Sequence, residues 1–137
     1  MIDQTDNEII RLLSENSRMQ WQEIGERVHL TGQAVRNRIS RLEKLGIIEG
    51  YTVKLDYEKL GRCVTAYVTL FMKTTDHAAF KKYIAGNSFV TDAHRISGEG
   101  CYILKVEAAD RQSLNDFLDE ILAFGNYRLN MSIDKIK

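Results

Sequence analysis

The sequence predicts an α+β fold in two parts, a bundle of three short helices followed by a sheet whose strands alternate with two further helices. Apolar residues recur at helical spacing through the first part, whereas β-branched and aromatic runs alternate with amphipathic segments in the second. The 137 residues are enough for two very small domains. We expect domains over residues 1–50 and 63–137, joined by a short strand and hinge over residues 51–62.

The helices of the first part are expected over residues 3–14, 21–28 and 32–45. Acidic residues crowd the first turn of the first helix, where the helix dipole favours anions. Gly25 lies inside the second helix, where glycine costs about 1 kcal/mol relative to alanine. Because glycine permits close backbone approach, we expect the third helix to cross the second at this residue.

The third helical segment has the features of a DNA-reading helix. Thr31 can accept hydrogen bonds from the N–H groups of the helix that it opens. Between its apolar positions this segment contains only one acidic residue, Glu43. It contains four basic residues, Arg36, Arg38, Arg41 and Lys44. Two short helices joined by a tight turn, the second of them basic, are typical of a helix-turn-helix, here of a winged-helix-like domain. The alternative is an ordinary helical hairpin whose arginines are only solvated.

Base contacts are expected near the start of this helix. An arginine fork reads guanine through two hydrogen bonds, and an asparagine amide reads adenine in the same way. We therefore expect Arg36 and Asn37 to meet base edges. Gln33 and Ala34, in the first turn, suit an adenine edge and a thymine methyl group.

Phosphate contacts are expected from basic side chains and from the N–H groups that open the helix. The residues concerned are Arg18, Thr31, Gly32, Arg41 and Lys44. Arg38 is equally compatible with a DNA contact and with a structural ion pair to Glu43 or Glu49.

The pattern of residues 63–137 predicts strands and helices in the order β-α-β-β-α-β. Strands are expected over residues 64–72, 90–96, 101–106 and 127–133, and helices over residues 76–85 and 110–122. This order is that of a ferredoxin-like sandwich, with both helices on one face of a four-stranded sheet. The other face would be bare, so we expect at least a homodimer that buries it.

Composition limits the classes of function. The formal net charge is 0, so DNA affinity must come from a local patch that oligomerisation multiplies. No apolar run approaches the roughly 20 residues of a membrane span, and the acidic N-terminus lacks the features of a signal peptide. We expect a cytoplasmic, nucleoid-associated protein that does not contact membranes.

No catalytic site, metal site or cofactor is expected. Cys63 and Cys101 are isolated in the sequence, which favours two buried thiols over a zinc site or a disulfide. The three histidines have no carboxylate or serine at triad-like spacing, so an enzyme is not expected.

Several motifs resemble one family. They are Ile2-Asp3-x-x-Asp6-x-x-Ile9-Ile10, Ser17-Arg18, Thr31-x-x-x-Val35-x-x-Arg38-Ile39-x-x-Leu42-Glu43, Gly46-Ile47-Ile48-x-Gly50-Tyr51, Leu55-Asp56 and Leu60-Gly61. They are similar to the Lrp/AsnC family, the leucine-responsive and asparagine-synthesis, or feast/famine, regulators. The resemblance implies a transcription regulator that binds double-stranded DNA and oligomerises through a C-terminal effector domain. It also implies a homodimer that assembles to a tetramer or octamer.

The loop between the second and third strands is the candidate effector site, over Gly98, Glu99, Gly100 and Cys101. In the family, the corresponding turn carries an aspartate before the aromatic residue of the next strand, and neighbouring backbone helps to bind an amino-acid effector between dimers. Cys101 stands in place of that aspartate, and a neutral thiol is a poor partner for an ammonium group. Glu99 is a substitute carboxylate, and the alternative is a plain glycine-rich turn.

Three functions remain open from the sequence. The first is a sequence-selective regulator with an amino-acid effector, and the second is an architectural protein that wraps or bends DNA without one. The third is an amino-acid-binding module whose helices contact a protein partner. The missing aspartate favours the second function, whereas the basic third helix argues against the third.

Overall fold

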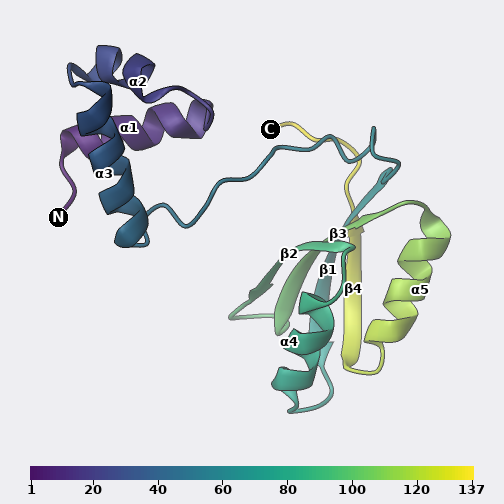
Figure 1. The fold of residues 1–137 in the computed structure, drawn as a ribbon. Coiled ribbons are helices and arrows are strands. Elements are labelled where there is room, and N and C mark those ends of the chain that lie inside the picture. The colour runs from purple at the N-terminus through teal and green to yellow at the C-terminus, as the bar shows by residue number, and fades with distance from the viewer. The chain divides into compact units, whose positions relative to one another are not determined.

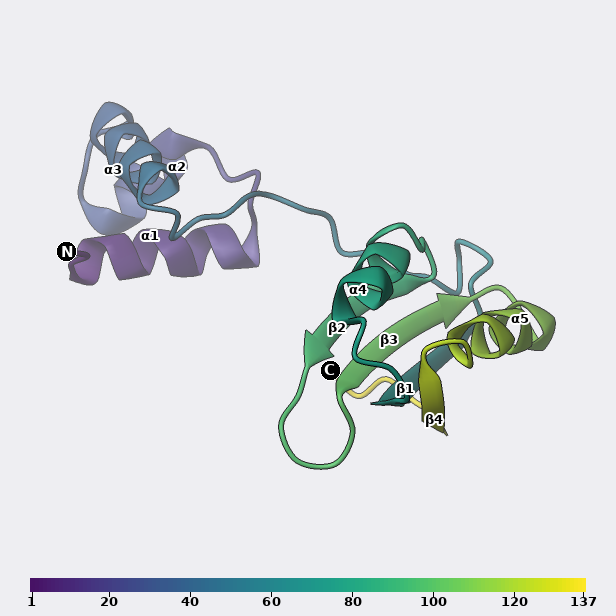
Figure 2. The same ribbon diagram turned by 90° about the horizontal axis from the view of Figure 1, so that it is seen from below.

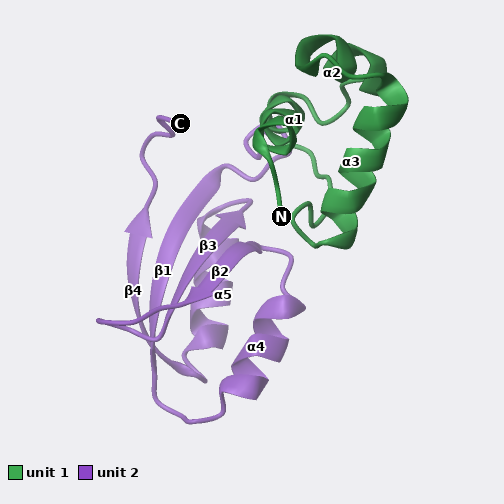
Figure 3. Ribbon diagram, turned by 90° about the vertical axis from the view of Figure 1, so that its left-hand side faces the viewer, with its two compact units in different colours: residues 1–54 green, residues 55–137 purple.

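The computed structural model describes residues 1–137, which divide into two compact units, Met1–Lys54 and Leu55–Lys137 (Figure 3). Unit 1 contains α1 (Gln4–Glu15), α2 (Trp21–Val28) and α3 (Gly32–Lys44). Unit 2, shown with its elements in Figure 1, contains β1 (Val64–Met72), α4 (His77–Ala85), β2 (Val90–Arg95), β3 (Tyr102–Ala108), α5 (Arg111–Ile121) and β4 (Gly125–Met131). The predicted α+β fold is confirmed. Every helix falls short of the length and apolar character that crossing a membrane requires.

The three helices of unit 1 converge on one small core. Its buried members are Ile9, Leu12, Leu13, Ile24, Val35 and Ile39. As predicted, Thr31 caps α3, because its hydroxyl oxygen accepts from the backbone N–H of Ala34 at 3.1 Å. Asp3 and Asp6 form a reciprocal capping box at the start of α1. The core contacts of Val35 and Ile39 turn the apolar side of α3 inward and leave its polar side exposed.

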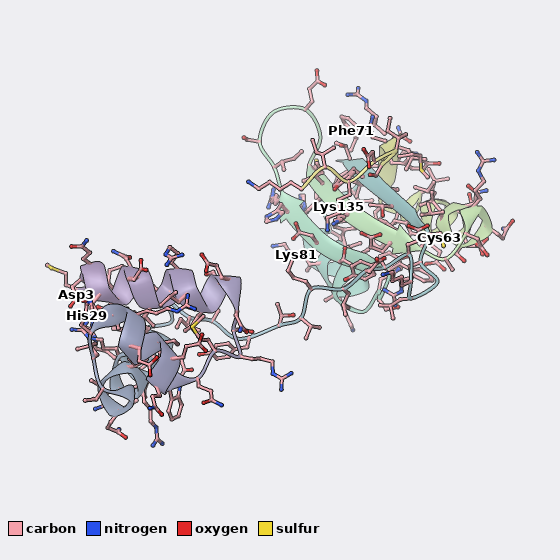
Figure 4. The ribbon with its side chains drawn as sticks, turned by 90° about the horizontal axis from the view of Figure 1, so that it is seen from above. Asp3, His29, Cys63, Phe71, Lys81 and Lys135 are labelled. Atoms are coloured by element: carbon pink, nitrogen blue, oxygen red, sulfur yellow. The ribbon has the colours of Figure 1, made fainter.

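The closest backbone to Gly25 is the connection before α3 and not α3 itself, contrary to our expectation. A Cβ atom at Gly25 would lie 2.3 Å from the carbonyl oxygen of Leu30, which belongs to the connection between the two helices. His29, labelled in Figure 4, has a left-handed φ of 58° and folds that connection back. The N–H of Leu30 then donates to the carbonyl of Gly25 at 2.9 Å. The tight turn, rather than a helix crossing, therefore requires glycine here.

Unit 2 is a four-stranded antiparallel sheet in the order β2-β3-β1-β4, as a ferredoxin-like sandwich requires. Both α4 and α5 cover the same face (Figure 3). Alternate residues of β1, Ala66, Val68 and Leu70, point into the core beneath the helices and are fully buried. Tyr67, on the open face of the same strand, is 42% exposed. The predicted bare face is therefore present.

Two predicted local structures are wrong. Residues 51–55 do not form a strand, because no other segment of the chain pairs with them. The segment Ser97–Gly100 is a wide loop rather than a tight turn (Figure 2), and the N–H of Ile96 donates to the carbonyl of Cys101 across its base at 3.0 Å.

We expect Gly25→Ala to destabilise unit 1, although alanine has the higher helix propensity by about 1 kcal/mol. The added Cβ must displace the backbone at Leu30, and such overpacking typically costs about 1–3 kcal/mol. Trp21 is the only tryptophan and lies in α2, so its fluorescence during a urea titration reports the unfolding of unit 1. Gly50→Ala is the matched control, because a Cβ there meets nothing within 4 Å. Equal midpoints for the two variants would contradict this account.

Candidate nucleic-acid interface

An exposed polar stripe runs along α3. With 3.6 residues per turn, positions 33, 37, 40 and 44 share one face of the helix. Gln33, Asn37 and Lys44 are exposed there, and Ser40 is half-buried. The amide of Gln33 donates to the side-chain oxygen of Asn37 at 3.0 Å, so the two amides lie side by side. Our sequence reasoning missed Ser40, although its helical spacing from Asn37 places it on this stripe.

Arg36 flanks the stripe and lies over an aromatic ring. Its guanidinium carbon is 5.1 Å from the ring centroid of Trp21 on α2. A cation–π contact at an exposed site contributes about 0.5–1 kcal/mol and restricts the side chain. Stacking uses the flat face of the guanidinium group and leaves its N–H edge for an acceptor such as guanine.

Arg38 points away from the stripe, toward α1. Its Nη1 donates to Oδ2 of Asp3 at 2.7 Å and to Oδ1 of Asp6 at 2.9 Å. Figure 4 labels Asp3 at the start of α1. The structural ion pair considered for Arg38 is thus present, but its partners are these aspartates and not Glu43 or Glu49.

Arg41 belongs to the same cluster, although we expected it to bind phosphate. Its guanidinium donates to the carboxylate of Asp6, and its Nη1 donates to the carbonyl of Met1 at 3.0 Å. Burial by itself would raise the pKa of the Asp6 carboxyl group. The hydrogen bonds from the Asp3 backbone, Arg38 and Arg41 outweigh burial and lower this pKa to about 2. The carboxylate therefore stays charged and holds both arginines.

The other predicted DNA contacts lie around the start of α3 or just before α2. Gly32 packs closely on α2, because a Cβ there would lie 3.3 Å from the backbone nitrogen of Gln22. Arg18 is exposed, and its backbone N–H donates to the side chain of Asn16 at 3.0 Å. Thr31 uses its hydroxyl oxygen for the helix cap, and Ala34 is half-buried in the first turn.

The chain that leaves α3 is attached to it by one side-chain hydrogen bond. The hydroxyl of Tyr51 donates to Oε1 of Glu43 at 2.8 Å. Partial burial and the neighbouring Glu43 carboxylate both raise the pKa of Tyr51. Glu43, the only acidic residue of α3, is thus engaged by the following segment and not by an arginine.

The candidate effector loop in unit 2 has the backbone freedom that its glycines suggested. Gly98 and Gly100 have φ values of 84° and 86°, which favour glycine. A Cβ at Gly100 would also lie 2.6 Å from Cγ2 of Thr69. The N–H of Cys101 donates to the carbonyl of Leu70 at 2.7 Å and ties the end of the loop to β1.

Our sequence reasoning missed an arginine beside this loop. Nη1 of Arg128, on β4, lies 3.5 Å from Oε2 of Glu99. The guanidinium carbon of Arg128 is also 5.6 Å from the ring centroid of Phe71, which Figure 4 labels. Arg128 lies opposite Thr69 in the β1–β4 pairing, and that register could not be read from the sequence. A cation and an anion therefore stand together at the loop.

The cysteines differ from our expectation of two buried thiols, because Cys63 is exposed and Cys101 is half-buried. No group of three or more potential metal ligands occurs in the chain.

The fold and the α3 stripe define a helix-turn-helix protein with a separate ferredoxin-like domain. Residues 2–43 match the AsnC-type helix-turn-helix domain, and residues 65–137 match the Lrp/AsnC ligand binding domain. The chain is 45% identical over 136 residues to the HTH-type transcriptional regulator LrpB of Bacillus subtilis, covering 99% of this chain and 91% of that relative.

Solved structures agree with this assignment. LrpC of Bacillus subtilis superposes with a TM-score of 0.95 at 31% identity, covering 100% of this chain and 98% of that chain. A Neisseria meningitidis transcriptional regulator in complex with L-Met superposes with a TM-score of 0.93 at 25% identity, covering 100% and 93%. The chain belongs to the Lrp/AsnC family, and it is a DNA-binding transcriptional regulator rather than an enzyme.

We expect the free energy of unfolding of unit 1 to fall as the pH is lowered from about 4 to about 2. The pKa of Asp6 is about 2 in the folded protein and 3.8 ordinarily, so its contribution is full above the ordinary value and is lost as the pH falls through about 2. The loss is on the order of 1–2 kcal/mol. Urea titrations of the wild type and Asp6→Asn, followed by Trp21 fluorescence, isolate this part as a difference. A difference that does not vary with pH would show that folding leaves the Asp6 pKa unchanged.

Proposed function

We propose that the exposed stripe of α3 reads base edges in the major groove of DNA. The paired amides of Gln33 and Asn37 carry this proposal, since such amides recognise adenine, and Arg36 beside them suits guanine. Ser40 and Ala34 add smaller contacts. Phosphates are bound around the stripe by Lys44, by Arg18 and by the helix start at Thr31 and Gly32.

These three base-reading side chains favour a sequence-selective regulator over an architectural DNA-binding protein. An architectural protein of the same build remains the second candidate, because Cys101 stands where the family resemblance leads us to expect an aspartate. Measuring affinity for selected and random duplexes over a range of salt separates the two, since only selective binding gives a large specificity ratio. Because the proposed target is chromosomal DNA, we place the protein in the cytoplasm at the nucleoid.

Arg36→Ala is expected to weaken binding to the preferred duplex by about 1–3 kcal/mol and to relax base preference, because a bidentate base contact is lost. The preferred duplex is obtained by selection from a random library, and affinity is measured by fluorescence anisotropy. Arg11→Ala is the matched control, since Arg11 on α1 is held by Glu8 at 2.6 Å and by Glu15. If Arg36→Ala binds and selects like the control, the stripe does not face the bases.

We further propose a homodimer, or a multiple of dimers, formed through the open face of the sheet. This face carries the exposed apolar side chains of Tyr67 and Ile103 among polar neighbours. The linker adds Tyr51, Val53 and Leu55, which are 53%, 71% and 46% exposed on an unpaired segment of alternating pattern. A second copy of the chain would cover both surfaces, and it would place two α3 helices on one DNA molecule.

Tyr67→Lys should therefore dissociate the assembly at micromolar concentration. The new ammonium group would lie opposite Lys105, whose own ammonium group already pairs with Glu107, and it would be buried against the second copy. We expect sedimentation velocity to show a dimer or larger species for the wild type and a monomer for the variant. Leu122→Lys is the control, because Leu122 is similarly exposed at 44% but lies at the end of α5. A wild-type chain that sediments as a monomer would refute the proposal.

We also propose that an amino acid binds at the Gly98–Cys101 loop of unit 2. Arg128 and Glu99 are exposed and weakly paired, so a zwitterion could replace their mutual contact at little cost. Its carboxylate would bind Arg128 and loop N–H groups, and its ammonium group would bind Glu99. The structure of a relative with L-Met supports an effector of this class.

We expect Glu99→Gln to weaken amino-acid binding at least tenfold, because it removes the only carboxylate of the loop. Cys101→Asp should strengthen binding, because it restores the carboxylate that the family carries. Calorimetry with the standard L-amino acids tests both, with Asp119→Asn on the surface of α5 as the control. Failure of both the wild type and Cys101→Asp to bind any amino acid would remove this site and favour the architectural candidate.

A further inference from the structure

Asp6 is one of two charged residues that are buried in this chain, and none of its surface is exposed. It lies in the first turn of α1, but its side-chain partners are on α3. Its carboxylate accepts from the backbone N–H of Asp3 at 3.0 Å, from Nη1 of Arg38 at 2.9 Å and from Nη2 of Arg41. A carboxylate outside the reading stripe is therefore attached to the helix that carries the stripe.

This attachment restrains the rotation of α3 about its own axis. Arg38 and Arg41 are three residues apart, and both must reach the same carboxylate. The apolar contacts of Val35 and Ile39 are non-directional and tolerate a small rotation, whereas charge-assisted hydrogen bonds are short and have defined geometry. Base readout requires this rotation to be fixed, because the stripe must face the base edges.

The attachment also withholds positive charge from DNA. α3 carries four basic residues, and Asp3 and Asp6 neutralise two of them. The side chains of Arg38 and Arg41 are 30% and 44% exposed, so both would reach the surface if they were released. Free arginines bind phosphates whatever the base sequence, and thereby raise non-specific affinity.

We propose that Asp6 is a positioning residue that determines the specificity of DNA recognition. It sets the rotation of α3 and, together with Asp3, keeps Arg38 and Arg41 from binding phosphates, although it contacts no DNA itself. This role rests on the DNA-reading function proposed for α3. A purely structural role for Asp6 would change stability alone, whereas this role changes the specificity ratio and the salt dependence of binding.

The test compares full-length wild type with Asp6→Asn, which keeps the shape of the side chain but removes its charge. Affinity for the selected duplex and for a random duplex is measured over a range of salt, at a temperature where Trp21 fluorescence shows unit 1 folded. We expect the specificity ratio to fall at least tenfold, and affinity for the random duplex to rise. The slope of log K against log salt should steepen by about 0.9, because Arg41 gains a phosphate contact while Arg38 is still held by Asp3.

Ile9→Val is the matched control, because it weakens the packing of α1 without changing charge, and Ile9 is fully buried. It should lower stability and leave the ratio and the slope unchanged. A folded Asp6→Asn with the ratio and slope of the wild type would overturn the proposal.

Two further variants retain Asp6, and they test the proposal even where Asp6→Asn fails to fold. Arg41→Gln should leave the wild-type slope unchanged, because Arg41 is bound to Asp6 and not to phosphate; a slope lowered by about 0.9 would overturn the proposal. Lys44→Gln should lower the slope by about 0.9, because Lys44 lies at the end of the stripe. If Lys44→Gln has no effect, the orientation proposed for α3 fails, and that failure is distinct from failure of the role assigned to Asp6.

Discussion

The sheet of unit 2 carries helices on one face only, and the proposed assembly and DNA binding both depend on how the other face is covered. Its open face combines apolar Tyr67 with a buried Glu107, whose carboxylate accepts from Thr65 at 2.5 Å and lies 3.5 Å from Lys105. Apolar surface favours burial against a second copy, and a fixed polar cluster restricts the registers in which two copies fit. An uncovered face of this kind is unsuited to a chain that acts alone.

The proposed assembly would also reconcile DNA binding with a net charge of 0. The basic residues of α3 are not all available, because two are bound by aspartates of α1. On α3, one copy thus presents only Arg36 and Lys44 as cations without a carboxylate partner, and weak binding sites gain affinity when they are linked. Joining two copies would bring two base-reading stripes to one DNA molecule, together with their positive charges. In the proposed assembly, specific binding would therefore gain more than non-specific binding, provided that each α3 is held in one orientation.

The sequence predicted those features that depend on local spacing. The capped start of α3, the apolar positions Val35 and Ile39, and the order of the strands follow from periodicity and from residue type. The partners of Arg38 could not be predicted in this way. Asp3 and Asp6 lie 35 and 32 residues away and meet Arg38 only because the helices pack together.

Other errors have the same physical origin. The alternating pattern of residues 51–55 has strand character, but a strand requires a partner and this chain supplies none. Arg128 reaches the effector loop only because β4 pairs with β1 in one particular register, which is a property of the folded sheet.

Membership of the family determines the fold of the effector domain more firmly than it determines the ligand. The backbone of the loop is constrained by Gly100, whose φ of 86° and close contact with Thr69 exclude other residues. The charge at the loop is not constrained in this way, since Cys101 is neutral and the exposed side chains of Glu99 and Arg128 supply the ion pair. A carboxylate on the exposed side chain of Glu99 is less preorganised than one at the edge of β3, so part of the binding free energy is lost in ordering it. The same exposed pair also interacts more weakly at high salt. An effector bound in this way would therefore occupy the site at higher amino-acid concentrations than one held by a fixed aspartate.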